Sequence, residues 1–391
     1  MSIQPGRGSG RNPLQLVTAV IFAASLGTAA SAQDSVKIGF HAPLTGFAAA
    51  DGKSARQGVE LAVKEANAAG GLGGKKIVLV TYDDEGKPEN AIPIANKLIG
   101  QDKVIMTVSG SYSGPTRAAA AVFQRAGMPY ISAYAIHPDI TRAGDFVFRT
   151  GMMGEVQGRA GAKLIGETLK KKKVEIVAVN NDFGQALTAG FKEAAPKFGL
   201  EIVAERTFGM ADRQFGPLVT QIKADNPEVI YAPGYFFNAG PLVAQLRAAG
   251  VTADVIGQEG YDGQRFIEIA GKAAEGVIIT TSLDRDSQAP ATRAFITDYE
   301  KEYKDRVDMV AASGYSAISV ALEALKKAGS QDGKTIRDTI RQNTFETAIG
   351  KLAFNNLGEV KKAVQVQVVK DGNFHRYGVI DDLQYLAPPE R

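Results

Sequence analysis

Residues 66–99 read ANAAGGLGGKKIVLVTYDDEGKPENAIPIANKLI, and this stretch decides the fold class. Its first residues continue a helical pattern that ends at Gly70, a residue suited to the left-handed conformation of a helix C-cap. Ile77–Tyr82 is an apolar, β-branched run that predicts a buried strand, and the acidic turn Asp83–Asp84 follows it. Pro88 then fits the first turn of a second helix. The stretch therefore predicts a helix–strand–helix unit of an α/β protein.

The same alternation of strand-like and helix-like segments continues to about residue 282, with helices predicted among others at Ser54–Ala69, Thr116–Ala126, Gln185–Phe198 and Pro241–Ala249. Such alternation is typical of βαβ units and a parallel sheet. The helical patterns end on the same residue type each time, at Gly70, Gly127, Gly199, Gly250 and Gly329. The order repeats after residue 150, which predicts two lobes. Three consecutive helices are then expected, followed by a closing hairpin that turns at Lys370–Asn373.

Residues 1–32 have the composition of a cleaved signal peptide. Arg7 and Arg11 give a positive start, Leu14–Leu26 is an apolar run too short to span a bilayer, and Ala30–Ala32 is a small-residue cleavage site. The alternative is a buried N-terminal helix, which is disfavoured because a new strand pattern begins soon after this site. We therefore expect export to the periplasm, with no later segment long and apolar enough to cross a membrane.

Charge and cysteine content exclude several classes of function. The net charge of +3 falls to +1 once the two arginines of the leader are removed, which gives no argument for a nucleic acid or an anionic membrane as partner. The chain has no cysteine, which excludes a thiol nucleophile, a thiolate metal site and a lipid-modified N-terminal cysteine. An exported protein of this size has cores large enough to need no disulfide.

Motifs for cofactor chemistry are missing from the sequence. The glycine-rich segment Gly70–Lys76 fails the phosphate-loop pattern and is interpreted as a turn. His41, His137 and His375 have no second ligand at metal-binding spacing, so we expect no metal, no cofactor and no catalytic residue. No G-x-S-x-G nucleophile elbow is present, although the sequence leaves a dispersed Ser-His-Asp set open. An exported α/β enzyme is therefore the remote alternative.

Five loops are expected at carboxyl ends of parallel strands, where open α/β sheets bind ligands. Ser109–Thr116 (SGSYSGPT) comes before a helix predicted from Thr116, so it is either a site for an anion such as a carboxylate or a simple N-cap loop. The other loops are Tyr134–Ile140, Asn181–Gly184, Gly234–Asn238 and Gln258–Asp262.

Two of these loops contain aromatic residues and a carboxylate. Tyr235, Phe236, Phe237 and Tyr261 favour a partly apolar pocket, in a chain with only 8% aromatic residues. Glu259 follows a strand that looks buried, and a buried carboxylate needs a partner. That partner is either a Lys or Arg of the protein or the ammonium group of a ligand.

The segments Val36–Gly46 (VKIGFHAPLTG), Ala66–Ile99 and Asp254–Thr281 resemble the periplasmic solute-binding proteins of ABC importers, of the branched-chain amino acid type. The resemblance covers essentially the whole chain after the leader. It implies the type I periplasmic binding protein fold, an α/β architecture of two doubly wound parallel-sheet lobes joined by three crossovers.

The candidate crossings are Thr150–Gly151, Thr281–Ser282 and Gly350–Lys351. Lobe 1 is then expected to comprise residues 33–150 and 282–350, and lobe 2 residues 151–281 and 351–391.

The resemblance also implies which residues bind the ligand. The Ser113 position takes the ligand carboxylate, with Ser111 as the fallback, while the main-chain carbonyl of Tyr134 and the acid Glu259 take the ammonium. Aromatic residues cover the ligand from the second lobe. Ile136 departs from the family pattern, which usually has a Thr there, and offers only its N–H. The expected ligand-binding residues are Ser111, Ser113, Tyr134, Ala135, Ile136, Phe183, Tyr235 and Glu259.

Together these features predict a monomeric binding protein that is not an enzyme. It is expected to capture a small amino acid, branched-chain or otherwise apolar, and to deliver it to the membrane subunits of an ABC permease. The nearer alternative is the same fold binding an aromatic carboxylate, an amide or urea.

Overall fold

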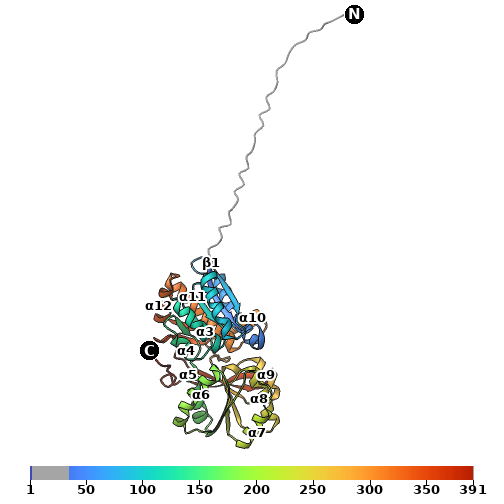
Figure 1. The fold of residues 1–391 in the computed structure, drawn as a ribbon. Coiled ribbons are helices and arrows are strands. Elements are labelled where there is room, and N and C mark those ends of the chain that lie inside the picture. Colours follow the sequence, from blue (N-terminus) through green and yellow to red (C-terminus); the bar gives the residue numbers. More distant parts are fainter. Residues whose placement is uncertain (2–34, 391) are drawn as a thin grey trace. The chain divides into compact units, whose positions relative to one another are not determined.

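The computed structural model describes Met1 and residues 35–390 (Figure 1). The predicted leader at residues 1–32 lies outside the described residues, apart from Met1. Within the described part of the chain, no helix is both long enough and apolar enough to cross a bilayer.

The first sheet has five parallel strands in the order β2-β1-β3-β4-β5. Its strands are β1 (Ser35–Ala42), β2 (Lys76–Asp83), β3 (Thr107–Ser109), β4 (Tyr130–Ser132) and β5 (Val147–Arg149). The helices between them are α1 (Ala49–Ala68), α2 (Pro88–Lys97), α3 (Ser113–Arg125) and α4 (Asp139–Arg142). Helix α1 packs with α11 (Met309–Ala328), whereas α2 packs with α3.

The second sheet has seven strands in the order β14-β13-β10-β9-β8-β6-β7. They are β6 (Lys173–Val179), β7 (Glu201–Phe208), β8 (Val229–Tyr231), β9 (Asp254–Gly257), β10 (Ile278–Thr281), β13 (Val364–Lys370) and β14 (Asn373–Ile380). The first five run parallel, and the C-terminal hairpin joins them antiparallel. Its helices are α5 (Gly154–Lys163), α6 (Asp182–Ala194), α7 (Gly216–Asp225), α8 (Phe236–Ala248) and α9 (Gln264–Ala270).

The remaining elements follow β10. They are α10 (Pro290–Tyr303), α11 (Met309–Ala328), α12 (Gly333–Gln342) and the small hairpin β11 (Thr344–Thr347) and β12 (Gly350–Ala353). Short π-turns extend two helices, at Leu98–Asp102 and Leu164–Thr168, and 3-10 turns lie at Gly46–Ala48, Ala195–Phe198, Glu259–Tyr261 and Gly271–Ala274. The chain passes between the elements of the two sheets three times: from β5 to α5, from β10 to α10 and from β12 to β13.

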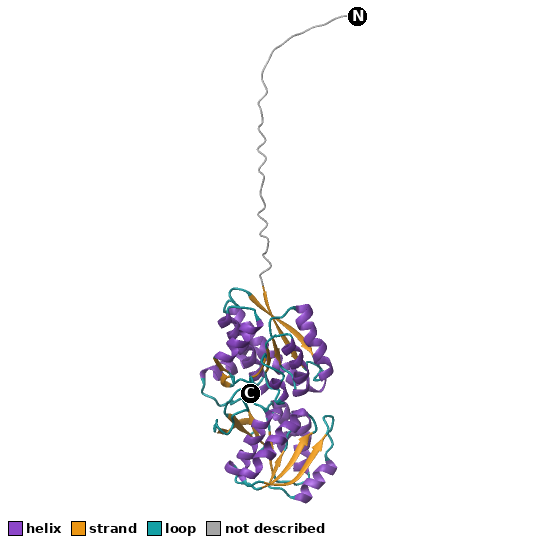
Figure 2. Cartoon of the chain, turned by 60° about the vertical axis from the view of Figure 1, so that its left-hand side comes forward, coloured by secondary structure: helices purple, strands orange, loops and turns teal. Residues whose placement is uncertain are grey.

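The doubly wound α/β class is confirmed, since strands of each sheet run between layers of helices (Figure 2). The C-cap prediction is confirmed too. Gly70, Gly127, Gly199, Gly250 and Gly329 all have positive φ, a conformation that glycine adopts without a Cβ penalty. The hairpin turn at Lys370–Asn373 is likewise found, with Lys370 paired to Asn373.

Several helices at the site begin earlier than predicted. Helix α1 begins at Ala49 rather than Ser54, and α6 begins at Asp182 rather than Gln185. Helix α3 begins at Ser113 rather than Thr116, so the end of the SGSYSGPT stretch is the first helical turn. Helix α8 begins at Phe236 rather than at Pro241, because Asn238 Oδ1 accepts from the backbone N–H of Tyr235 at 2.9 Å and caps the helix upstream. Pro241 lies inside the helix, where the upstream cap outweighs its missing N–H.

Candidate functional site

A narrow cavity of about 20 Å³ lies where carboxyl ends of strands from the two sheets meet. Its walls come from segments far apart in the chain: α1, the start of α3, the loop after β4, α6, the N-cap of α8, the turn after β9 and the start of α11. The lining residues are Asp51, Tyr112, Ser113, Tyr134, Ala135, Phe183, Tyr235, Glu259, Gly260, Met309 and Val310.

Most of the residues expected from the sequence lie at this cavity: Ser113, Tyr134, Ala135, Phe183, Tyr235 and Glu259. Ser111 and Ile136 are buried beside it and do not line it. Asp51, Tyr112 and the pair Met309–Val310 were missed. Tyr112 sits inside the loop already singled out, whereas Asp51 and the start of α11 have no local signal that marks them as ligand-facing.

The first turn of α3 faces the cavity and suits a negative group. Tyr112 is the N-cap, but its side chain does not bond to the first-turn N–H groups, so these stay available for an anion. Ser113 Oγ accepts from the backbone N–H of Ile136 at 3.2 Å, and the buried Ser111 Oγ has no hydrogen-bond partner in the described chain. The Ser113 side chain and the positive end of the helix dipole thus lie on one wall of the cavity.

The loop after β4 is held by a buried arginine. Arg149 donates to the carbonyls of Ala135 and His137, at 2.7 Å each, and its guanidinium pairs with Glu359 at 3.0 Å. Arg149 and Glu359 are both fully buried. Because two carbonyls of the loop are bound to one rigid planar group, the positions of Tyr134 and Ala135 at the cavity are fixed.

Glu259 is the carboxylate that the cavity presents opposite this wall. It is 3% exposed, and one of its oxygens accepts from Ser282 Oγ at 2.6 Å, while Oε2 has no hydrogen-bond partner within residues 35–390. Burial raises the pKa of Glu259, and the nearby charge of Lys362 opposes this shift. The buried Lys362 is the protein cation that acts on Glu259: their charges interact, no salt bridge joins them, and Lys362 Nζ also has no hydrogen-bond partner within residues 35–390. Glu259 Oε2 is therefore open to a ligand donor, with Lys362 as the competing cation of the protein.

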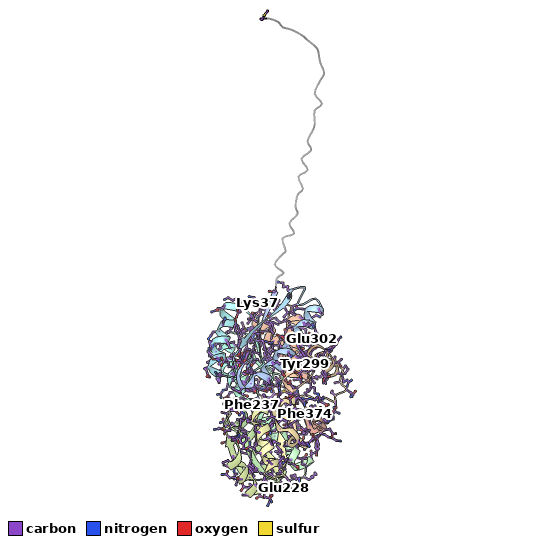
Figure 3. All side chains as sticks on the ribbon, turned by 90° about the vertical axis from the view of Figure 1, so that its right-hand side faces the viewer. Lys37, Glu228, Phe237, Tyr299, Glu302 and Phe374 are labelled. Carbon is purple, nitrogen blue, oxygen red and sulfur yellow. The ribbon has the colours of Figure 1, made fainter. Side chains whose placement is uncertain are left out.

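Stacked rings close the remaining side. The ring of Tyr235 stacks on Tyr112 at 4.5 Å and on Phe183 at 4.7 Å between centroids. Phe237, the second residue of α8 (labelled in Figure 3), meets Phe47 edge-on at 5.3 Å. Tyr112 and Phe47 belong to the first sheet's elements and the other rings to the second sheet's, so aromatic contacts join the two halves around the cavity.

The histidines lie away from this cavity. His41 bonds to Asp84 at 2.6 Å and to Tyr130 Oη at 2.7 Å, which ties the end of β1 to β4 and the turn after β2. Within the described residues, no group of His, Cys, Asp or Glu side chains has a geometry suited to a metal ion.

Comparison with known proteins gives a consistent set of similarities. Residues 35–373 match the family model described as periplasmic binding protein. The Leu/Ile/Val-binding protein homolog 3 of Brucella melitensis is 32% identical over 353 residues, covering 89% of this chain and 94% of that protein.

Two solved structures are similar to this one. The branched-chain amino acid transporter substrate-binding protein LivJ from Streptococcus pneumoniae, in complex with isoleucine, has a TM-score of 0.84 at 28% identity, covering 89% of this chain and all of that chain. A solute-binding protein of an ABC transporter from Rhodopseudomonas palustris, in complex with 3,4-dihydroxybenzoic acid, has a TM-score of 0.82 at 25% identity, covering 89% and 97%.

Proposed function

Since the chain belongs to the periplasmic binding protein family, in the group that includes the Leu/Ile/Val-binding proteins, we propose that it captures a small amino acid of branched-chain or other apolar type. The ligand lies in the cavity between the first turn of α3 and Glu259. Its carboxylate binds the N–H and hydroxyl groups around Ser113, and its ammonium binds Glu259 and the carbonyl of Tyr134. Phe183 and Tyr235 cover the side chain.

The observation that carries this proposal is the unpartnered Oε2 of Glu259. A carboxylate oxygen that is buried without a partner is unfavourable, and an ammonium group would satisfy it with a charge-assisted hydrogen bond. The first turn of α3 on the opposing wall offers the complementary site for a carboxylate. An α-amino acid carries both groups on one carbon, so a single ligand can bind to both walls at once.

In this proposal the two halves act as lobes that close over the ligand, with lobe 1 at residues 33–150 and 282–350 and lobe 2 at 151–281 and 351–391. The ligand contacts both lobes, so it binds the closed form better and shifts the population towards it. The monomer carries a signal peptide at residues 1–32 and no lipid anchor, and it delivers its ligand from the periplasm to ABC permease subunits. It breaks no bond and needs no cofactor.

A second candidate ligand is an aromatic carboxylate, an amide or urea. The aromatic wall of Tyr112, Phe183 and Tyr235 favours it, because flat rings stack on such a surface. The two carboxylates that line the cavity, Asp51 and Glu259, oppose a ligand whose only charge is negative.

A thermal-shift screen separates these ligands. L-amino acids and aromatic acids are added to the protein at about a hundredfold excess over Kd, where binding raises the stability by about 2.7 kcal/mol. We expect a rise in Tm with at least one small L-amino acid. A shift with an aromatic acid together with none from any amino acid would refute amino acid capture.

A further inference from the structure

Asp51 lines the cavity but has no role in the proposed binding of the ligand's α-carboxylate and α-ammonium groups. It lies in the first turn of α1, is partly buried and lines the cavity together with Glu259. Its Oδ2 accepts from Tyr112 Oη at 2.7 Å. The side chain therefore has a fixed orientation on the wall contributed by the first sheet's elements.

The charge of the cavity is unbalanced. Its lining has two carboxylates and, among the described lining residues, no Lys, Arg or His. Burial raises the pKa of Asp51 to about 7, and the charges of Asp308 and Asp262 push it in the same direction. The neighbouring Arg285 is already paired with Asp262. A zwitterionic amino acid neutralises Glu259 with its ammonium and leaves Asp51 facing the rest of the ligand.

The aromatic wall of the cavity continues to this carboxylate. A second pocket shares Asp51, Glu259 and Gly260 with the first. The stacked rings of Tyr112 and Tyr235 border the first cavity and suit the carbon atoms of a side chain. Because Tyr112 Oη donates to Asp51, the edge of this stack lies beside the carboxylate.

We infer that Asp51 is a specificity-determining residue that binds a hydrogen-bond donor at the end of the ligand side chain. The inference rests on the proposed function and narrows it to small amino acids whose largely apolar side chain ends in a hydroxyl, amide or ammonium group. A hydrocarbon of the same shape would cover the Asp51 carboxylate without replacing the water that it displaces. Tyr112 donates one hydrogen bond to Asp51 Oδ2, and the donor group of the ligand supplies a second hydrogen bond to the carboxylate.

Isothermal titration calorimetry with shape-matched ligands tests this inference. Threonine is compared with valine, and asparagine with leucine, on the full-length protein. We expect the donor-bearing member of a pair to bind about tenfold to a hundredfold more tightly. In Asp51→Leu that preference should disappear or reverse. Glu60→Gln, on the exposed face of the same helix, removes one negative charge and should keep the preference.

Asp51→Asn keeps the size of the side chain and serves if Asp51→Leu does not fold. In that variant the preference should shrink at least threefold, because the amide no longer attracts donors with a full charge. The inference is overturned if amino acids bind while the ratio within each pair is the same in wild type and variants. Failure of every amino acid to bind the wild type overturns the proposed function instead, and the inference with it.

Discussion

Glu259 shows how one residue combines burial with an unsatisfied oxygen. Its neighbour Ser282 satisfies only one carboxylate oxygen, and Ser282 lies on the segment where the chain leaves β10. The hydrogen bond from Ser282 orients the Glu259 carboxylate and leaves its second oxygen for a ligand. Residues that bind ligands are often less well satisfied than residues that serve the core alone.

Replacing Glu259 with Gln tests this reading of the residue. The variant keeps the shape and removes the charge, so the affinity for an amino acid ligand should fall about 30-fold or more, on the order of 2 kcal/mol. Isothermal titration calorimetry measures the loss. Glu167→Gln, an exposed acid paired with Lys163 at 2.7 Å, is the matched control and should bind as the wild type does. An unchanged affinity in Glu259→Gln would contradict recognition of the ammonium.

Arg149 does not line the cavity; it holds the loop after β4 through the carbonyls of Ala135 and His137. In Arg149→Met, Glu359 would remain buried without its cation, so the free energy of unfolding should fall by about 3–5 kcal/mol. Urea denaturation measures the change. Arg265→Met breaks an exposed pair with Glu268 and should change the stability by less than about 1 kcal/mol. Equal losses in the two variants would show that burial of the pair is unimportant.

At the scale of elements, glycines allow the helices to pack closely. A Cβ atom on Gly190 of α6 would lie 2.1 Å from the carbonyl oxygen of Glu155 on α5. One on Gly58 of α1 would lie 2.1 Å from the carbonyl oxygen of Ala311 on α11. Because α6 carries Phe183 and the start of α11 carries Met309, this close packing also positions two sides of the cavity.

Gly190→Ala should therefore destabilise the protein by about 1–3 kcal/mol, since the contact is with rigid backbone. Gly216→Ala is the matched control, because a Cβ at that position meets nothing within 4 Å at the first residue of α7. It should be neutral or stabilising by up to about 1 kcal/mol. The measurement is chemical denaturation, and a stable Gly190→Ala protein would contradict the packing described here.

At the scale of the whole molecule, carboxyl groups that line the two cavities have raised pKa values, because burial disfavours the charged form. The pKa of Asp51 is raised to about 7 and that of Asp308 to about 6, in both cases chiefly by burial. The folded state then holds these protons more tightly than the unfolded state does. Each group therefore contributes stability at low pH that is lost as the pH rises from about 4 towards its folded pKa.

The free energy of unfolding of the unliganded protein should therefore fall as the pH rises. In Asp51→Asn this fall should be smaller. Relative to the wild type, the variant should gain on the order of 1 kcal/mol between about pH 4 and pH 8, because its amide cannot ionise. Asp308 keeps its raised pKa in the variant, so a part of the dependence remains. Urea denaturation at several pH values measures it, and parallel pH profiles of the two proteins would contradict the prediction.

The fold class could be predicted from the amino-acid sequence alone. Alternating strands and helices with glycine C-caps predicted the parallel sheets, because each signal depends on residues that are neighbours in the chain. The loops predicted at carboxyl strand ends contain the candidate site residues that the family resemblance singles out, and the structure brings these to one cavity: Ser113, Tyr134, Phe183, Tyr235 and Glu259.

Only the tertiary structure decided where helices α3 and α8 begin and which distant residues complete the cavity. The capping of α8 by Asn238 is one bond that overrides the strong local signal of Pro241. Asp51 and Met309 reach the cavity because α1 packs against α11, a contact between segments about 250 residues apart in the chain. Whether a carboxylate finds a protein partner also depends on such long-range packing, so Glu259 could be identified from sequence while its free oxygen could not.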